Sequence, residues 1–171
     1  MKYTFALILL VFISCSKQDI YETSVHPEKV EARLHENAII KGNSSNSGIA
    51  GYYQIQSGNK IVFEYQYTAE DNEMIADDEY SEFFVFQIDP SQTNIELKDD
   101  QVLALNPIYR YSCYCYQDGG LLSIEGSLKI KKKTAGKYEV TADLLFNLKS
   151  DIVPEGENLQ QDVKFSVVFK K

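Results

Sequence analysis

Two of the three cysteines lie two positions apart in the tyrosine-rich stretch "YRYSCYCYQDGG", which spans residues 109–120. In an extended strand, residues i and i+2 share a face, so Cys113 and Cys115 lie on the same face. A disulfide needs Cα atoms within about 6.8 Å, and an extended i, i+2 pair lies at that limit. Thiol redox motifs favour two intervening residues and a helix N-terminus. We predict that both thiols pack in the core as small hydrophobes, with a strained disulfide as the alternative.

Metal binding is the other chemistry that these cysteines suggest. A structural zinc ion needs four ligands, and the two histidines, His26 and His35, lie at no recognised metal spacing. The acidic segment "AEDNEMIADDEYSE", residues 69–82, supplies carboxylates for calcium but lacks the EF-hand order and its central glycine. We therefore expect no metal and no other cofactor, and we interpret the acidic segment as a solvated loop.

Tyrosines are the candidate ligand-binding residues, because a tyrosine ring offers contact area at low entropic cost. The candidates are Tyr52, Tyr53, Tyr114 and Tyr116. Cross-strand pairing on a sheet is the alternative role for these side chains. The absence of tryptophan argues against a dedicated sugar-stacking site. A basic run, "KIKKK" at residues 129–133, is interpreted as solubilising charge at a hairpin turn rather than as a lipid-binding patch.

No hydrolytic constellation is visible in the sequence. Both histidines precede the segment that we expect to fold into strands, and no serine lies on a nucleophile elbow. The chain has no phosphate-binding glycine loop and no zinc-protease helix motif. We predict that the protein is not an enzyme; catalysis through surface carboxylates is the least favoured hypothesis.

The chain opens with "MKYTFALILLVFISCSKQD", in which Lys2 precedes the uncharged apolar run Phe5–Ile13. A run of this length is too short to span a bilayer as a helix, which needs roughly 20 apolar residues, and it has the length of a secretory signal core. A small residue, Ser14, stands directly before Cys15 at the end of the run. This arrangement resembles the lipobox of bacterial lipoproteins, with Phe12 in place of the usual leucine.

The resemblance implies that the signal is cleaved before Cys15 and that this cysteine carries acyl chains. Several acyl chains bind a membrane almost irreversibly, because each buried CH₂ contributes about 0.8 kcal/mol. The residue after Cys15 is not aspartate, which by the sorting rules of that family favours the outer membrane. The start "SCSK" is similar to that of small envelope lipoproteins of Bacteroidota. Their acidic surface-export cluster is reduced here to Asp19, so the expected location is the outer membrane, facing either the periplasm or the cell surface.

The composition favours one acidic domain made of strands. The formal net charge is −8, and loss of residues 1–14 would remove Lys2 and no acid, which gives −9. An acidic domain repels phosphate backbones, so we exclude nucleic acid as a partner. The chain is rich in Tyr (12) and Phe (9), which favour strands over helices.

Alternation of apolar and polar residues with a period of two predicts strands from residue 49 onward. In "KYEVTADLLFNLK", for example, Tyr138, Val140 and Ala142 share one face, and Glu139 and Thr141 share the other. The predicted strands lie near residues 50–56, 60–69, 80–88, 93–98, 101–117 (broken near Pro107), 121–132, 137–149 and 161–170. Turn signals between them, such as Ser57-Gly58-Asn59 and Asp118-Gly119-Gly120, favour hairpins.

We therefore expect an all-β fold with about eight antiparallel strands in a meander, closed into a small lipocalin-like barrel or folded into a two-sheet sandwich. The expected organisation is a signal peptide at 1–14, a lipidated tether with one short helix within "SVHPEKVEARLHENAI" at 15–48, and a β domain at 49–171. The predicted function is a lipid-anchored binding module of the cell envelope, whose partner is an envelope protein or a glycan. The alternative is a carrier of a small apolar ligand.

Overall fold

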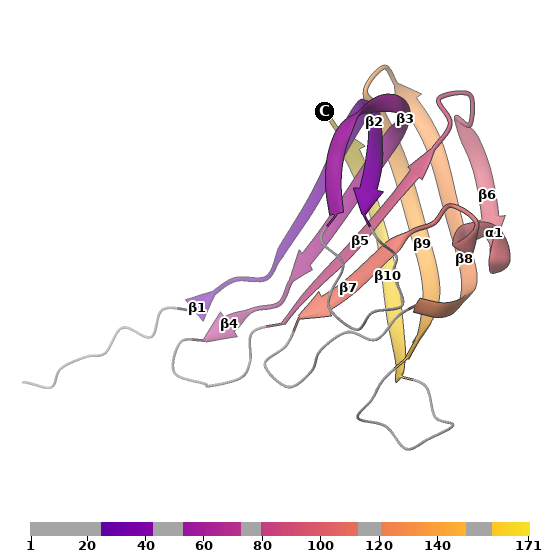
Figure 1. Cartoon of the computed structure of the whole chain (residues 1–171). Helices are drawn as coiled ribbons and strands as arrows, with labels where there is room; N and C mark the ends of the chain where they lie inside the picture. The colour runs from indigo at the N-terminus through magenta and orange to yellow at the C-terminus, as the bar shows by residue number, and fades with distance from the viewer. Residues whose placement is uncertain (1–24, 43–52, 73–79, 113–120, 150–158) are drawn as a thin grey trace, which may run out of the picture.

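The computed structural model describes residues 25–42, 53–72, 80–112, 121–149 and 159–171, and nearly all of them lie in β-strands (Figure 1). The elements are β1 (Val25–His26), β2 (Lys29–Gly42), β3 (Tyr53–Thr68), β4 (Asp71–Asn72), β5 (Ser81–Ile88), β6 (Asn94–Lys98), α1 (Asp100–Leu103), β7 (Ile108–Ser112), β8 (Leu121–Thr134), β9 (Lys137–Leu148) and β10 (Leu159–Lys170). The all-β class expected from the alternation is confirmed. In the described part of the chain, no helix has the length and apolar character needed to cross a membrane.

Eight strands form one sheet in the order β6-β8-β9-β10-β2-β3-β5-β7, and β1 and β4 form a separate small ribbon. Every pairing in the large sheet is antiparallel except that of β10 with β2, which is parallel and rests on the single pair Lys170 and Arg33. This joint divides the sheet into two halves, which we call the β9 half (β6, β8, β9, β10) and the β3 half (β2, β3, β5, β7). The joint also makes the sheet mixed rather than a simple antiparallel meander.

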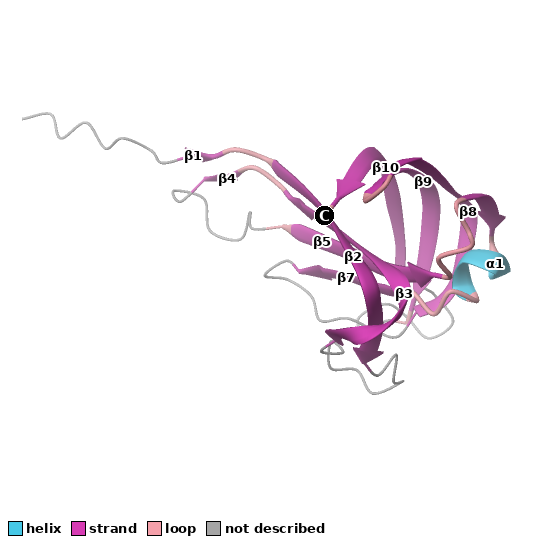
Figure 2. Cartoon of the chain, turned by 90° about the horizontal axis from the view of Figure 1, so that it is seen from above, coloured by secondary structure: helices cyan, strands magenta, loops and turns pink. Residues whose placement is uncertain are grey.

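The two halves curl toward each other around one aromatic core (Figure 2). Phe63 on β3 contacts Tyr138 on β9 edge to face, with ring centroids 5.5 Å apart, and contacts Phe169 on β10 at 5.3 Å. Phe84 on β5 contacts Phe146 on β9 at 5.3 Å. These strands are not neighbours in the sheet, so the contacts require the inner faces of the two halves to face each other. The sheet is not closed into a barrel, because β6 and β7 remain unpaired with each other at its edges.

The short helix expected within "SVHPEKVEARLHENAI" is wrong, because Val25–His26 form β1 and the residues from Lys29 onward belong to β2. Val30 and Leu34 are separated by four positions, which fits a helix turn but fits a strand equally well. Ala32 completes a period of two with them, and Glu31 and Arg33 occupy the opposite face. The β structure therefore begins upstream of the expected start near Ile49, and β2 lies at the centre of the sheet.

The far end of the β2–β3 hairpin folds back over the outer face of the β3 half. Asn37 adopts a positive φ of 55°, and Ala38 lies opposite two residues of β3, which marks a bulge. The fold-back buries Ala38 against Val62 and Val85 in a second, smaller cluster. The turn expected at Ser57-Gly58-Asn59 is therefore wrong: β3 runs continuously through these residues.

The remaining strand predictions hold with one exception. The strand expected over 101–117 is divided, because α1 occupies its start and β7 begins only after Pro107. Asp99 precedes α1 with a φ of 46°, and its carboxylate accepts a hydrogen bond of 2.7 Å from the Gly126 backbone N–H. This contact fixes α1 against β8, and Val102 of α1 is fully buried in the core.

Candidate binding site on the inner face

Strand pairing places one carboxylate between two tyrosines on the inner face of the β3 half. Glu82 of β5 lies opposite Tyr67 of β3 on one side and opposite Tyr111 of β7 on the other. Glu82 shares its face with Phe84 and Phe86, which are fully buried in the core, because side chains alternate along a strand. The alternation that builds the core thus also directs Glu82 toward the inside of the curled sheet.

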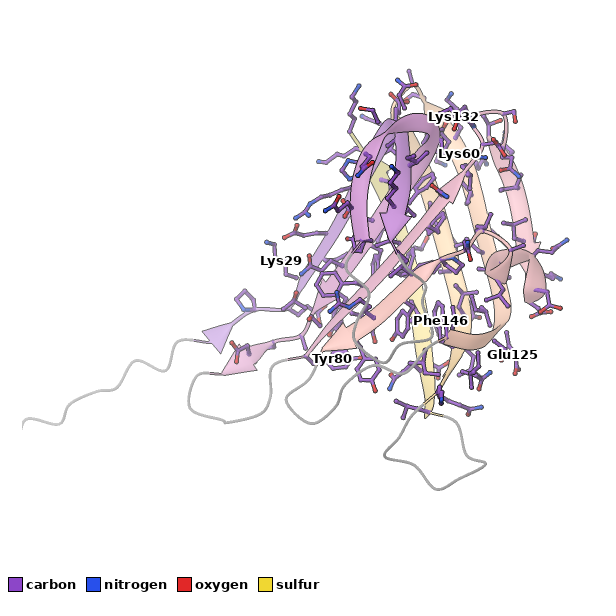
Figure 3. All side chains as sticks on the ribbon, in the orientation of Figure 1. Lys29, Lys60, Tyr80, Glu125, Lys132 and Phe146 are labelled. Carbon is purple, nitrogen blue, oxygen red and sulfur yellow. The ribbon has the colours of Figure 1, made fainter. Side chains whose placement is uncertain are left out.

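Aromatic rings continue from this row toward the core. The ring of Tyr80, just before β5, lies 6.5 Å from that of Tyr67 and 6.3 Å from that of Tyr111. Tyr109 lies 6.4 Å from Tyr111 and stacks on Phe146 of the β9 half at 4.2 Å. Figure 3 shows Tyr80 and Phe146 at the same end of the sheet, opposite the end that holds Lys60 and Lys132. We call the following set the tyrosine end: Tyr67, Tyr80, Glu82, Tyr109 and Tyr111.

Among the residues that the structure describes, the Glu82 carboxylate has a neutral hydrogen-bond partner and no cationic one. It accepts a hydrogen bond from the Tyr80 hydroxyl. Burial raises the pKa of Glu82 above its usual value, and the Tyr80 hydrogen bond offsets only part of that effect. Among the described residues, no basic side chain forms an ion pair with Glu82. A carboxylate in this environment is desolvated without being neutralised.

Tyr67, Tyr80 and Tyr109 stay neutral at physiological pH, because the pKa of each hydroxyl is raised above its usual value. Burial, reinforced by hydrogen bonding to Glu82 and by its charge, raises the pKa of Tyr80, and burial raises the pKa of Tyr109 further. Burial also raises the pKa of Tyr65, which stacks on Phe165 at 4.0 Å, to about 12. The Tyr109 hydroxyl is buried and has no hydrogen-bond partner in the described part of the chain. The side chains of Tyr67, Tyr80 and Glu82 remain partly exposed.

This arrangement is suited to binding rather than to proton transfer. It combines partly exposed aromatic faces, neutral hydroxyl groups and one carboxylate, all supported by paired strands and a packed core. General acid–base catalysis on a glycoside would require a second carboxyl facing Glu82. Glu31 and Glu139 have lowered pKa values because of hydrogen bonds from Lys29 and Lys133, and both lie on the outer face.

Tyr53, one of the sequence-predicted binding residues, lies on the outer face under the folded hairpin. Its hydroxyl donates a hydrogen bond of 2.7 Å to Glu64 Oε1, and Glu64 Oε2 lies 2.5 Å from His35 Nε2. Burial and the Glu64 carboxylate raise the pKa of Tyr53. A hollow of about 50 Å³ adjoins these groups. Tyr53 is therefore part of a polar network that supports the hairpin, and its ring is not an exposed stacking platform.

A larger groove, of about 430 Å³, lies on the outer face of the β9 half. Its lining is Glu96, Lys98, Asp99, Glu125, Gly126, Ser127, Asp143, Leu144, Leu145 and Asp162. Lys164 lies between two of its carboxylates, 3.5 Å from Asp143 and 3.7 Å from Asp162. The groove is open, and Lys129 and Lys164 are counterions for three of its acids, Glu96, Asp143 and Asp162.

The other predicted site residues, Cys15, Tyr52, Tyr114 and Tyr116, lie outside the described residues, as do Cys113 and Cys115. Their predicted roles stay predictions. The described ranges contain no group of three or more His, Cys, Asp or Glu side chains placed to hold a metal ion.

Sequence reasoning missed the tyrosine end because Tyr80 and Glu82 were assigned to the acidic loop. The signal was present, since Tyr80, Glu82, Phe84 and Phe86 alternate with a period of two into the strand expected at 80–88. Their common face was therefore readable from the sequence, but the flanking tyrosines on β3 and β7 were not.

Comparisons of this chain with protein-family models, with curated proteins and with solved structures found no match.

Proposed function

We propose that this protein is a lipid-anchored binding module of the bacterial cell envelope that holds its ligand at the tyrosine end. The observation that carries the binding role is the row Tyr67, Glu82 and Tyr111 on the inner face, with Tyr80 hydrogen bonded to the carboxylate. Partly exposed tyrosine rings bind ligands at low entropic cost, because each ring has few rotatable bonds. The paired strands hold these rings in place before a ligand arrives, which reduces the cost of ordering them.

The anchoring part of the proposal rests on the lipobox-like sequence before Cys15. Acylation there would attach the protein to a membrane, with the outer membrane as the expected location and either face of it open to the domain. Lys29, at the start of β2, pairs with Thr68 at the end of β3, so the chain enters the sheet beside Tyr67. A protein anchored through Cys15 would therefore be attached at the end of the sheet that carries the tyrosines.

A binding module is better supported than a carrier with an apolar interior. Between the two halves, the inner face holds Phe63, Phe86 and Phe146, all fully buried. Phe63 and Phe86 stack with centroids 4.8 Å apart. A carrier needs an internal cavity of a few hundred Å³, whereas these rings are fully buried between the two halves of the sheet. We also propose a non-catalytic role, because the pKa of Glu82 is shifted by burial and by the Tyr80 hydrogen bond, and by no second carboxyl among the described residues.

Two measurements test the proposal. The first is incorporation of radiolabelled palmitate in bacterial cells, followed by membrane fractionation. Label and membrane association should be present in the wild-type chain and absent from Cys15→Ala. Cys113→Ala, which alters a cysteine outside the lipobox, is the matched control and should retain both. Palmitate on a chain that lacks Cys15 would contradict the assigned anchor.

The second measurement is a ligand-observed NMR screen of the purified protein with a mixed library of amines, acids, sugars and short peptides. Compounds that bind the wild type should lose saturation transfer with Tyr80→Ala. They should keep it with Tyr53→Phe, which removes a tyrosine hydroxyl from the opposite face. If no compound is affected by Tyr80→Ala, the tyrosine end is not the binding site.

A further inference from the structure

We propose that the ligand of the tyrosine end carries an organic ammonium group, held by the Glu82 carboxylate and the rings of Tyr67 and Tyr80. This inference rests on the proposed binding function and names the chemistry of its ligand. It starts from the environment of Glu82, a partly buried carboxylate with aromatic neighbours and, among the described residues, no ion-pair partner.

An unpaired carboxylate on the inner face carries a desolvation cost that an apolar or amide side chain would avoid. Tyr80 donates one hydrogen bond to Glu82, and a carboxylate can accept about four. In the strand pairing, the immediate neighbours of Glu82 are the aromatic residues Tyr67 and Tyr111. A cationic ligand would supply a positive charge beside the Glu82 carboxylate. Its binding would offset the desolvation cost of that carboxylate.

The rings add a second attraction for the same kind of ligand. A cation within about 6 Å of a tyrosine ring centroid is attracted to the negative face of the ring, and the attraction increases when the site is partly desolvated. Tyr67 and Tyr80 are 6.5 Å apart and inclined at 62°, so their faces are differently oriented around one region of the inner surface. An alkylated ammonium suits such a site because it is weakly hydrated and has apolar surface of its own.

A metal ion fits the site less well than an organic cation. Calcium takes six to eight oxygen ligands, usually from several carboxylates. Within the described residues, no three potential ligands are close enough to form a metal site. A second carboxylate, that of Glu28, lies beside Tyr67. It accepts a hydrogen bond of 3.4 Å from the Tyr67 hydroxyl.

The test is a titration monitored by tyrosine fluorescence, which no tryptophan emission masks because the chain has no tryptophan. The probes are choline and its neutral isostere 3,3-dimethyl-1-butanol, which have the same shape and differ in charge. We expect saturable binding of choline and much weaker binding of the alcohol. Glu82→Gln should weaken choline binding roughly 10- to 100-fold, the range for loss of a charge-assisted contact. Glu125→Gln, which neutralises an exposed carboxylate on the β9 half, is the matched control and should bind choline like the wild type.

Equal binding of both probes, unaffected by Glu82→Gln, would overturn the ammonium assignment while leaving a binding site at the tyrosine end. Failure of choline to bind would also overturn the assignment, and the library screen with Tyr80→Ala would then decide separately whether the site binds another ligand. Thermal unfolding of each variant shows that a lost signal does not result from a lost fold.

The ammonium group has two sources, a soluble amine or a lipid headgroup, and a second arm distinguishes them. The protein is mixed with vesicles of phosphatidylethanolamine or of phosphatidylglycerol and sedimented. Preferential binding to phosphatidylethanolamine that is lost in Glu82→Gln assigns a headgroup. Choline binding without such vesicle binding assigns a soluble ligand, and both results support the inference.

Discussion

Glu82 accepts its hydrogen bond from Tyr80, the residue two positions earlier on the same face of the chain. Tyr80 and Glu82 are close in the sequence, but the residues around them come from distant parts of the chain. Tyr67 and Tyr111 come from strands on either side, and Phe146, which supports Tyr109, comes from the other half of the sheet. A partly buried carboxylate in this position should affect both the stability of the fold and the binding of ligands.

Glu82→Gln should raise the melting temperature at pH 7. The pKa of Glu82 is raised in the folded state above its usual 4.5, so the folded protein binds this proton more tightly than the unfolded chain does. The contribution of Glu82 to stability is therefore fully present below the unfolded pKa, and is lost as the pH rises through the folded pKa. The amide keeps the shape and has no charge to desolvate. The check is thermal unfolding of both proteins from pH 3 to pH 8.

The difference in melting temperature between Glu82→Gln and the wild type should decrease as the pH falls below about 4.5. Glu125→Gln, at an exposed position, should show no comparable gain. A lower melting temperature for Glu82→Gln at pH 7 would mean that the carboxylate stabilises the fold, and that our account of its burial is wrong.

Tyr109→Phe and Tyr138→Phe should each stabilise the protein by about 1 kcal/mol, because a buried polar group without a partner costs about 1 to 3 kcal/mol. Both hydroxyls are buried and lack hydrogen-bond partners in the described residues. Urea unfolding measures the free energy in each case. The two variants should differ in binding, since only Tyr109 belongs to the tyrosine end; a choline affinity lowered equally by both would contradict the location of the site.

Phe146→Ala should destabilise the fold by about 3 to 5 kcal/mol, the usual cost of deleting a buried phenyl ring. Phe146 is fully buried and contacts Phe84 and Tyr109, so its loss leaves a cavity between the two halves of the sheet. Chemical denaturation followed by circular dichroism gives the value. Leu122→Ala, at a position that is 47% exposed, is the control and should change stability by less than about 1 kcal/mol. A small effect of Phe146→Ala would indicate that the halves do not share one core.

Gly126→Ala should be more harmful than Gly136→Ala, although both glycines have positive φ values, of 109° and 67°. A Cβ at Gly126 would lie 2.1 Å from the carbonyl oxygen of Asp143, so β8 and β9 would have to separate. At Gly136 the nearest atom would be 3.9 Å away, so only the conformational strain of about 1 to 2 kcal/mol remains. Melting temperatures of the two variants test this order, and equal losses would contradict the close approach of β9 to Gly126.

The fold class was readable from the sequence because side-chain alternation is a local property. The pattern of Tyr138, Val140 and Ala142 identified both a strand and its buried face, and these side chains are buried as expected. The same pattern in Val30, Ala32 and Leu34 lies in β2, although the spacing of four between Val30 and Leu34 also fits the helix that we predict there. Here the information was present and the interpretation was wrong.

The candidate site was readable only in part. The face shared by Tyr80, Glu82 and Phe84 follows from their spacing along one strand. That Tyr67 and Tyr111 flank Glu82 depends on the order and register of strands far apart in the chain. A period of two fixes which face a side chain occupies, but it does not fix which strand lies beside it.

The sequence by itself determined an acidic, strand-rich chain with an aromatic inner face and a lipobox-like start. Only the tertiary structure decided that β10 joins β2 through one parallel pair, that β6 and β7 end the sheet unpaired, and that the two halves curl around one core. The physical reason is that strand pairing relies on backbone hydrogen bonds that nearly every residue can make. The choice of neighbours is therefore made by the packing of rings such as Phe63, Tyr138 and Phe146, which contact one another only once the chain is folded.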